Sequence, residues 1–333
     1  MRGETVVVTG ASAGLGRAVA RHFGQNGAQV GLIARGTDGL EAAKREIEAV
    51  GAKALVLPAD VADAGQVEEA AAKVEAELGP IDIWINNAMA SVFSPVKQME
   101  PDDYKRVTDV TYLGVVYGTL AALKRMMPRD RGTIVQVGSA LAYRSIPLQS
   151  AYCAAKHAVA GFTDSLRCEL IHDKSHVCLT MVQMPALNTP QFGWVKSRLR
   201  RRAQPVPPIF QPEVGAKAIY WAAHHTRREV YVGAPTVAAI VGNKIAPGML
   251  DYYLGRTGYD SQQTEEPEDP NRPHNLWQAV PGDPGTRGTF SSLAHDDSCE
   301  LWAVLNRNWL LLAATGILGG LGYLLSSRKT RTN

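Results

Sequence analysis

Short apolar runs rich in β-branched residues alternate with helix-forming segments from residue 5 to about residue 232 of this chain. The strand-like runs lie at 5–10, 28–34, 52–60, 81–87, 132–139 and 176–184. Because they are apolar on both faces, these strands are expected in a parallel sheet that is covered on both sides. The segments between them are long enough for right-handed helical crossovers. The pattern predicts an α/β fold with a doubly wound parallel sheet and helices on both faces.

Composition narrows the class of protein. With 333 residues and an apolar fraction of 45%, the chain can bury a full core. A formal net charge of +3 is too small to indicate a nucleic-acid partner. The cysteines show neither paired nor metal-like spacing, so we expect free thiols, a reducing compartment and no metal site. The N-terminus lacks the apolar core of a signal peptide, and the folded part is therefore expected in the cytoplasm.

A glycine-rich turn follows the first expected strand and opens the first expected helix. It reads Thr9-Gly10-Ala11-Ser12-Ala13-Gly14-Leu15-Gly16. Glycines allow a tight turn and a close approach to a pyrophosphate, and the helix N-terminus offers unpaired N–H groups. A glycine-rich turn alone is a weak signal, because it can be a plain strand–helix connection. Its place between the first strand and the first helix favours a dinucleotide site.

The end of the second expected strand bears on which dinucleotide binds. A site that prefers NAD commonly carries a carboxylate there, which holds the ribose 2′-hydroxyl. Here the strand ends at Ala34 and Arg35 follows, while Arg17 lies just inside the helix after the glycine turn. Two guanidinium groups near one ribose suit a 2′-phosphate, which accepts charge-assisted bidentate hydrogen bonds. The pattern favours NADP(H), with solvated surface arginines as the alternative.

A stretch around residues 138–162 carries side chains that could move a proton. Tyr152 and Lys156 are four residues apart on an expected helix, so they share one face. A lysine ammonium there could lower the pKa of the phenol and hold a ribose hydroxyl, so that the phenol acts as acid or base near neutrality. Ser139 ends the preceding strand and could hydrogen-bond a substrate oxygen. Such Tyr–Lys pairs are common on helix surfaces, but the position downstream of a glycine turn favours catalysis.

In order and approximate spacing, these motifs resemble those of the short-chain dehydrogenase/reductase family. The resemblance covers residues 5 to about 235 and also includes Asp60-Val61, Asn86-Asn87-Ala88 and the segment 184–190. It implies a Rossmann-like sheet of about seven strands and hydride transfer at C4 of a nicotinamide. It further implies that Tyr152 passes the proton, that Ser139 orients the oxygen, and that Lys156 tunes Tyr152 and grips the ribose.

The same resemblance assigns other residues to the cofactor. Asp60 and Val61 should border the adenine, Asn87 and Ala88 should line the cofactor near its ribose, and Thr189 should approach the nicotinamide amide or the phosphates. The full set expected to bind NADP(H) is Gly10, Ser12, Gly14, Leu15, Gly16, Arg17, Arg35, Asp60, Val61, Asn87, Ala88, Tyr152, Lys156, Pro185 and Thr189.

Three positions depart from the family pattern. Met89 replaces the usual glycine after Asn-Asn-Ala and should narrow that wall, whereas Ala186 after Pro185 is a small change from glycine. Thr111 stands where the family normally has an asparagine that steadies a water linking the catalytic lysine to solvent. A threonine hydroxyl still donates and accepts. We therefore interpret Thr111 as a fourth catalytic residue, in an altered proton relay of a working enzyme.

The family-like domain is expected to span residues 1–256, with a substrate lid at about 187–212. In the lid, an apolar inner face is expected from Phe192, Trp194, Val195 and Leu199, and outward cations from Lys196, Arg198, Arg200, Arg201 and Arg202. Such a basic amphipathic segment could meet an anionic membrane or an acidic substrate group. A solvated charged helix is the alternative.

The C-terminal extension has two expected parts. Residues 257–300 are rich in Pro, Gly, Asp and Ser, which predicts an irregular, partly mobile tail. Residues 301–333 are expected to form a hydrophobic helix, because 309–325 carries no charge. As a helix this run would be roughly 26 Å long against an apolar bilayer core of about 30 Å. It could anchor the chain to a membrane by spanning it or by lying in its interface, or it could be buried between subunits.

These features together predict an NADP(H)-dependent oxidoreductase that interconverts a carbonyl and a lipophilic secondary alcohol. The resemblance also implies a homodimer or homotetramer, through helices at 102–128 and 150–173. A non-catalytic NADP(H)-binding sensor or scaffold is the main alternative. An epimerase or dehydratase on this fold is disfavoured, since the lid is short and no sugar-nucleotide domain is evident.

Overall fold

A seven-stranded parallel sheet forms the centre of the computed structural model, which describes residues 3–307. Its strand order is β11-β7-β6-β4-β1-β2-β3. The strands are β1 (Thr5–Thr9), β2 (Gln29–Ala34), β3 (Ala54–Pro58), β4 (Ile83–Asn86), β6 (Thr133–Ser139), β7 (Cys178–Met184) and β11 (Glu229–Tyr231). The predicted doubly wound α/β fold is therefore confirmed, and β11 is the strand that the sequence pattern did not locate.

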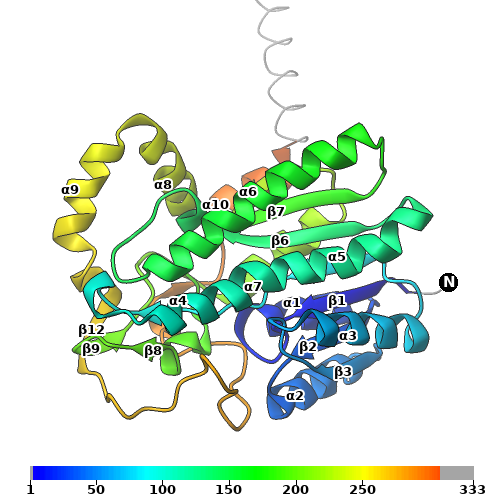
Figure 1. The fold of residues 1–333 in the computed structure, drawn as a ribbon, viewed down its shortest axis with the longest axis horizontal. Helices are drawn as coiled ribbons and strands as arrows, with labels where there is room; N and C mark the ends of the chain where they lie inside the picture. The colour runs from blue at the N-terminus through cyan, green and yellow to red at the C-terminus, as the bar shows by residue number, and fades with distance from the viewer. Residues whose placement is uncertain (1–2, 308–333) are drawn as a thin grey trace, which may run out of the picture.

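Helices cover both faces of this sheet (Figure 1). One layer contains α1 (Gly14–Gln25), α2 (Thr37–Glu48), α7 (Pro212–Ala223) and the short α10 (Cys299–Leu305). The other contains α3 (Ala64–Glu77), α4 (Pro101–Thr108), α5 (Gly114–Met126) and α6 (Ser150–His172). Each layer encloses its own buried apolar cluster against the sheet, and for this reason the strands are apolar on both sides.

The strand order reverses between β1 and β4. In open α/β sheets, ligands bind outside the carboxyl ends of the strands at such a reversal. In this chain that edge carries Thr9 at the end of β1, Asn86 at the end of β4 and Ser139 at the end of β6. The topology thus brings together the motifs that the sequence separates.

The lid segment does not form the solvated charged helix that was the alternative for it. It forms a short turn at Pro190–Gly193 followed by the strands β8 (Lys196–Ser197), β9 (Arg201–Ala203) and β10 (Ile209–Phe210). These strands pair with β5 (Val92–Phe93), β12 (Gln263–Pro267) and β13 (Ala294–His295), respectively. The expected apolar inner face exists in part, since Val195 is buried against Phe93 and Ala203, with Phe192 and Leu199 packed on them.

Four of the five predicted lid cations, Lys196, Arg198, Arg201 and Arg202, are paired with carboxylates of the chain, which corrects the expectation of a free basic face. Asp103 on α4 is 1% exposed and accepts from Lys196 Nζ at 2.9 Å and from Arg198 Nη2 at 2.5 Å. Burial alone would raise the pKa of Asp103, but these two hydrogen bonds bring it below its usual value. Arg201 and Arg202 meet acidic partners on and near β12.

The remaining elements follow the sheet in sequence. A helical hairpin of α8 (Ala234–Ile245) and α9 (Pro247–Thr257) projects from the body of the molecule (Figure 1). Residues 268–293 then run mostly without regular structure and return to the carboxyl edge of the sheet before β13 and α10. Within residues 3–307, no helix is both long enough and apolar enough to cross a bilayer. The run 309–325 lies outside the described residues.

Replacing Asp103 with asparagine should destabilise the protein by roughly 2–4 kcal/mol, because two partly buried cations would lose their carboxylate. The pKa of Asp103 is depressed in the folded state, so its contribution is present above the unfolded pKa of about 3.9 and is lost as pH falls through the lower folded value. Urea unfolding at pH 7 measures the loss. Asp102→Asn, at the exposed neighbouring position, is the control and should change little.

Candidate active site

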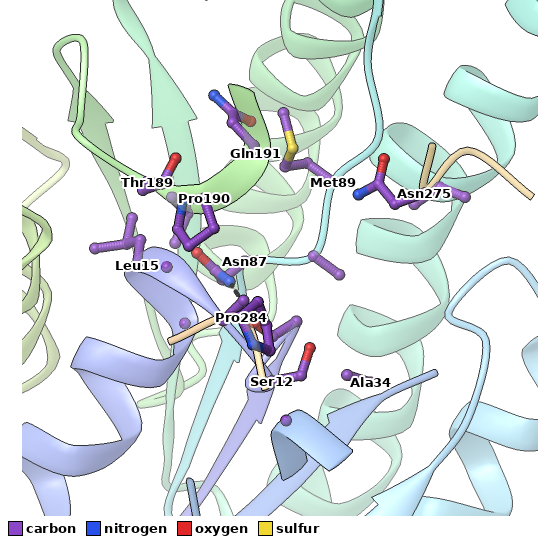
Figure 2. Close-up of a pocket in the computed structure, with 18 of the residues that line it drawn as sticks. Ser12, Leu15, Ala34, Asn87, Met89, Thr189, Pro190, Gln191, Asn275 and Pro284 are labelled. Carbon is purple, nitrogen blue, oxygen red and sulfur yellow. Dashed lines mark hydrogen bonds between the residues drawn. The ribbon is translucent and has the colours of Figure 1, made fainter. Parts of the chain in front are cut away.

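A cavity of about 250 Å³ lies at the carboxyl edge of the sheet, where the strand order reverses (Figure 2). Its walls come from the glycine turn, the ends of β2, β4, β6 and β7, the first turns of α6 and the start of the lid. The predicted residues that line it are Gly10, Ser12, Gly14, Leu15, Gly16, Arg35, Asp60, Val61, Asn87, Ala88, Ser139, Tyr152, Lys156, Pro185 and Thr189. One cavity thus joins the glycine turn to the predicted catalytic residues.

The glycine turn is shaped by positions where a side chain would not fit. Gly10 and Gly14 have φ angles of +69° and +53°, in the left-handed region that favours glycine. A Cβ on Gly16 would lie 2.2 Å from the carbonyl oxygen of Gly10. The backbone of the turn therefore faces the cavity without side chains in the way, which fits the close approach that a pyrophosphate needs.

Hydrogen bonds fix the end of β1 against the end of β4. The hydroxyl of Thr9 accepts from the main-chain amides of Asn87 at 2.9 Å and Ala88 at 3.0 Å. The side-chain amide of Asn87 donates back to the Thr9 carbonyl at 2.9 Å. Asn87 and Ala88 are held in this way beside the glycine turn, as the sequence motif predicted.

Three of the four predicted catalytic side chains, Ser139, Tyr152 and Lys156, line the cavity together. Tyr152 and Lys156 lie one turn apart on α6, with Lys156 Nζ 5.6 Å from the centre of the Tyr152 ring. The ammonium is 2% exposed and donates to the carbonyl oxygen of Val137 at 2.6 Å. Ser139 ends β6, where its hydroxyl accepts from the Leu141 amide at 3.1 Å.

Burial dominates the electrostatics of this group. It lowers the pKa of Lys156 to about 8. It also raises the pKa of Tyr152 well above its ordinary value, and a hydrogen bond with Ser139 only partly opposes the rise. The expectation that the ammonium lowers the phenol pKa is not met, because desolvation outweighs any attraction by Lys156. Near neutral pH Tyr152 therefore carries its proton, which suits a hydroxyl that gives a proton to a carbonyl oxygen.

Comparison with known proteins agrees with this geometry. A family model described as short chain dehydrogenase matches residues 4–198, which include the glycine turn and Ser139, Tyr152 and Lys156.

The chain belongs to the short-chain dehydrogenase/reductase family.

Individual relatives extend the match. The uncharacterized oxidoreductase YxnA of Bacillus subtilis (strain 168) is 33% identical over 84% of this chain and 79% of its own length. The 3-dehydrosphinganine reductase of Danio rerio is 34% identical, over 58% of this chain and 59% of its own length. The crystal structure of a metagenomic short-chain oxidoreductase in complex with NADP superposes with a TM-score of 0.58, at 27% identity over 69% of this chain and 96% of that one.

In this member of the short-chain dehydrogenase/reductase family, Thr111 lies away from the cavity where its predicted role would place it. It lies in a π-helical turn, Asp109–Leu113, between α4 and α5, and is fully buried. Its hydroxyl donates to the carbonyl of Ala90 and accepts from the amide of Ala90, both at 2.9 Å. It does not line the cavity. Both hydrogen bonds hold the loop that carries Met89, and a role of Thr111 in a proton relay stays a prediction.

Arg17 and Arg35 are separated by the structure, although the sequence suggested that they act together. Arg17 is 4% exposed, lies outside the cavity and pairs with Glu46 at 2.8 Å and with Asp283. Two carboxylates therefore already accept from both terminal nitrogens of this guanidinium. Arg35 lines the cavity, and it donates to the main-chain carbonyls of Leu276 at 3.3 Å and Asn275. Of the two, Arg35 is the one placed to meet a phosphate.

Sequence reasoning missed the part of the cavity that comes from the C-terminal extension. Asn275, Ala279, Val280, Gly282 and Pro284 all line it. Gln191 and Trp194 of the lid also line it. The extension reads as an irregular tail, and no periodicity or motif ties it to a site far away in sequence. Its proline and glycine content indicated a segment rich in turns, but not that this segment packs over the cavity.

The depressed pKa of Lys156 predicts a pH-dependent stability. Below pH 8 the lysine is charged in the folded and unfolded states, and the folded state bears the cost of burial. Between pH 8 and the ordinary value of 10.5 the unfolded chain binds more protons, so stability should rise with pH, by up to roughly 3 kcal/mol. Urea unfolding without cofactor at pH 7 and pH 10 should show this rise in the wild type and not in Lys156→Met. Parallel profiles for the two proteins would contradict it.

Proposed function

We propose that this chain is an NADP(H)-dependent oxidoreductase that interconverts a carbonyl and a secondary alcohol. The observation that carries the proposal is the convergence of Ser139, Tyr152 and Lys156 in a cavity that also contains the glycine turn. The nicotinamide, when bound, supplies or accepts the hydride at its C4 atom. The protein supplies the proton and the orientation of the substrate.

Each side chain has a distinct role in this reaction. In the reducing direction the Tyr152 hydroxyl donates its proton to the carbonyl oxygen as the carbon receives hydride, and the product is an alcohol. Ser139 hydrogen-bonds the same oxygen from the end of β6. Lys156, held by the Val137 carbonyl, offers its remaining N–H groups to a ribose hydroxyl, and its positive charge favours the phenolate that Tyr152 becomes.

Arg35 supports NADP(H) rather than NAD(H) as the cofactor. β2 ends at Ala34, so the strand end lacks the carboxylate that typically holds a free 2′-hydroxyl. Arg35 follows it at the cavity wall, and its hydrogen-bond partners there are neutral carbonyls. A phosphate oxygen is a stronger acceptor than a carbonyl for a guanidinium. The solved relative in complex with NADP is consistent with this preference.

The lid supports a lipophilic substrate. Phe192, Val195 and Leu199 form an apolar cluster with Phe93 and Ala203. Trp194 and Met89 add apolar surface to the cavity itself. One relative is a 3-dehydrosphinganine reductase, and a comparable long-chain carbonyl compound is the substrate class that we propose here.

Replacing Tyr152 with phenylalanine should lower kcat by roughly 10²–10⁴-fold with NADPH and long-chain ketones or aldehydes, because the proton donor is lost. NADPH binding, measured by fluorescence titration, should stay close to that of the wild type. Tyr143→Phe is the matched control, since Tyr143 hydrogen-bonds Glu229 and lies outside the cavity. NADPH binding without any turnover in the wild type, left unchanged by Tyr152→Phe, would favour the non-catalytic sensor or scaffold.

Replacing Arg35 with alanine should reduce the preference for NADPH over NADH by about tenfold or more, because a charge-assisted contact with the 2′-phosphate is removed. Titration of each cofactor gives the ratio of the two Kd values. NADH affinity serves as the internal control and should change much less. Equal losses for both cofactors would show that Arg35 does not recognise the 2′-phosphate.

A further inference from the structure

Residues 275–285, which we call the strap, cross the mouth of the cofactor cavity. At one end the amide of Asn275 donates to the carbonyl of Trp194 in the lid, at 2.9 Å. At the other end the carbonyl of Gly285 accepts from the amide of Gly14 in the glycine turn, at 3.1 Å. Asn275 and Pro284 accordingly appear on different sides of the cavity in Figure 2, near Met89 and near Ser12. The strap thus connects the lid to the glycine turn.

Between its ends the strap contacts groups around the end of β2. Its first carbonyls accept from Arg35. Farther along, the amide of Gly282 donates to Asp38 at the start of α2, at 2.8 Å, and Asp283 pairs with Arg17 of α1. Pro284 packs close to Gly39, where a Cβ would lie 3.2 Å from the proline ring. These contacts lie over the half of the cavity that the glycine turn and β2 define.

The strap roofs the cavity and does not fill it. A single cavity remains beneath it, continuous from Gly14 past Asp60 to Tyr152 and Thr189. Ala279, Val280 and Pro284 form part of its wall. A dinucleotide in this cavity would therefore be covered by protein on the side where the fold alone would leave it open to water.

The strap is built to open without disturbing the core. Its anchors are Leu276, which is fully buried in the apolar cluster of the α3–α6 layer, and Thr286, which is also buried just beyond its other end. Every residue from 277 to 285 is exposed or partly exposed. Segments with few buried apolar contacts open at low cost in free energy. Opening would break mainly polar contacts, among them the ion pair of Asp283 with Arg17.

We propose that the strap is a clasp for the cofactor, a role that rests on the proposed use of NADP(H). It opens to admit the dinucleotide and closes over its adenosine half, so that strap opening limits the rate of cofactor release. Asp283 is its latch, since this residue joins the strap to α1 through Arg17. Arg17 therefore contributes to cofactor retention without touching the cofactor.

The test compares two variants that each remove one carboxylate from Arg17. Asp283→Asn removes the partner on the strap, and Glu46→Gln removes the partner on α2. NADPH release is followed by stopped-flow fluorescence, with excess NADP⁺ as the displacing ligand. We expect about tenfold faster release and weaker binding for Asp283→Asn, as for loss of one charge-assisted contact, and near wild-type values for Glu46→Gln. Unchanged or slower release in Asp283→Asn would overturn the clasp.

Hydrogen exchange of the peptide containing residues 275–285 provides an independent readout. NADPH should slow exchange in the wild type, because the strap closes over it, and should slow it less in Asp283→Asn. Faster exchange on adding NADPH would mean that the cofactor displaces the strap, and no change would mean that the strap does not contact it; either result overturns the clasp. A wild type that binds no NADPH would instead refute the proposed function, and the clasp with it.

Discussion

The hydrogen bonds between the ends of β1 and β4 hold the site together. Thr9 and Asn87 bond across the point where the strand order reverses, through side chain and main chain. This places the glycine turn, which continues β1, beside the loop that continues β4. Since β6 pairs with β4, Ser139 reaches the same edge. The glycine turn and Tyr152 can then line one cavity, because neighbouring parallel strands all end at the same edge of the sheet.

Burying the group of Ser139, Tyr152 and Lys156 costs desolvation free energy, and this cost bears on its purpose. Lys156 is almost inaccessible to water, and one hydrogen bond to a main-chain carbonyl does not replace its hydration. A lysine so placed would be disfavoured if packing were its only purpose. The pKa of Lys156 is lowered and that of Tyr152 is raised. Such shifts are typical of sites in which a charge develops only during the reaction.

What the sequence could predict depended on the range of the interactions involved. Local patterns located six strands of the sheet and the Tyr152–Lys156 pair, because periodicity and spacing act within one element. The short strands of the lid were not predicted, because they depend on partners such as β12, far along the chain. Arg17 was placed beside the cofactor because its partner Asp283, 266 residues away, carries no local signal. Thr111 was assigned to a relay from the family resemblance, whereas its bonds to Ala90 and its place in a π-helical turn carry no local signal.

The pairing of β9 with β12, together with the bond from Asn275 to Trp194, joins the lid to the C-terminal extension. The covering of the substrate end and the covering of the adenosine end are therefore parts of one connected layer. Movement of the lid would therefore be transmitted to the C-terminal extension, and the reverse, through these main-chain hydrogen bonds. Under the proposed function this connection implies an order of events: the dinucleotide would bind before the outer layer closes, and the second reactant would meet an entrance whose shape the dinucleotide has already set.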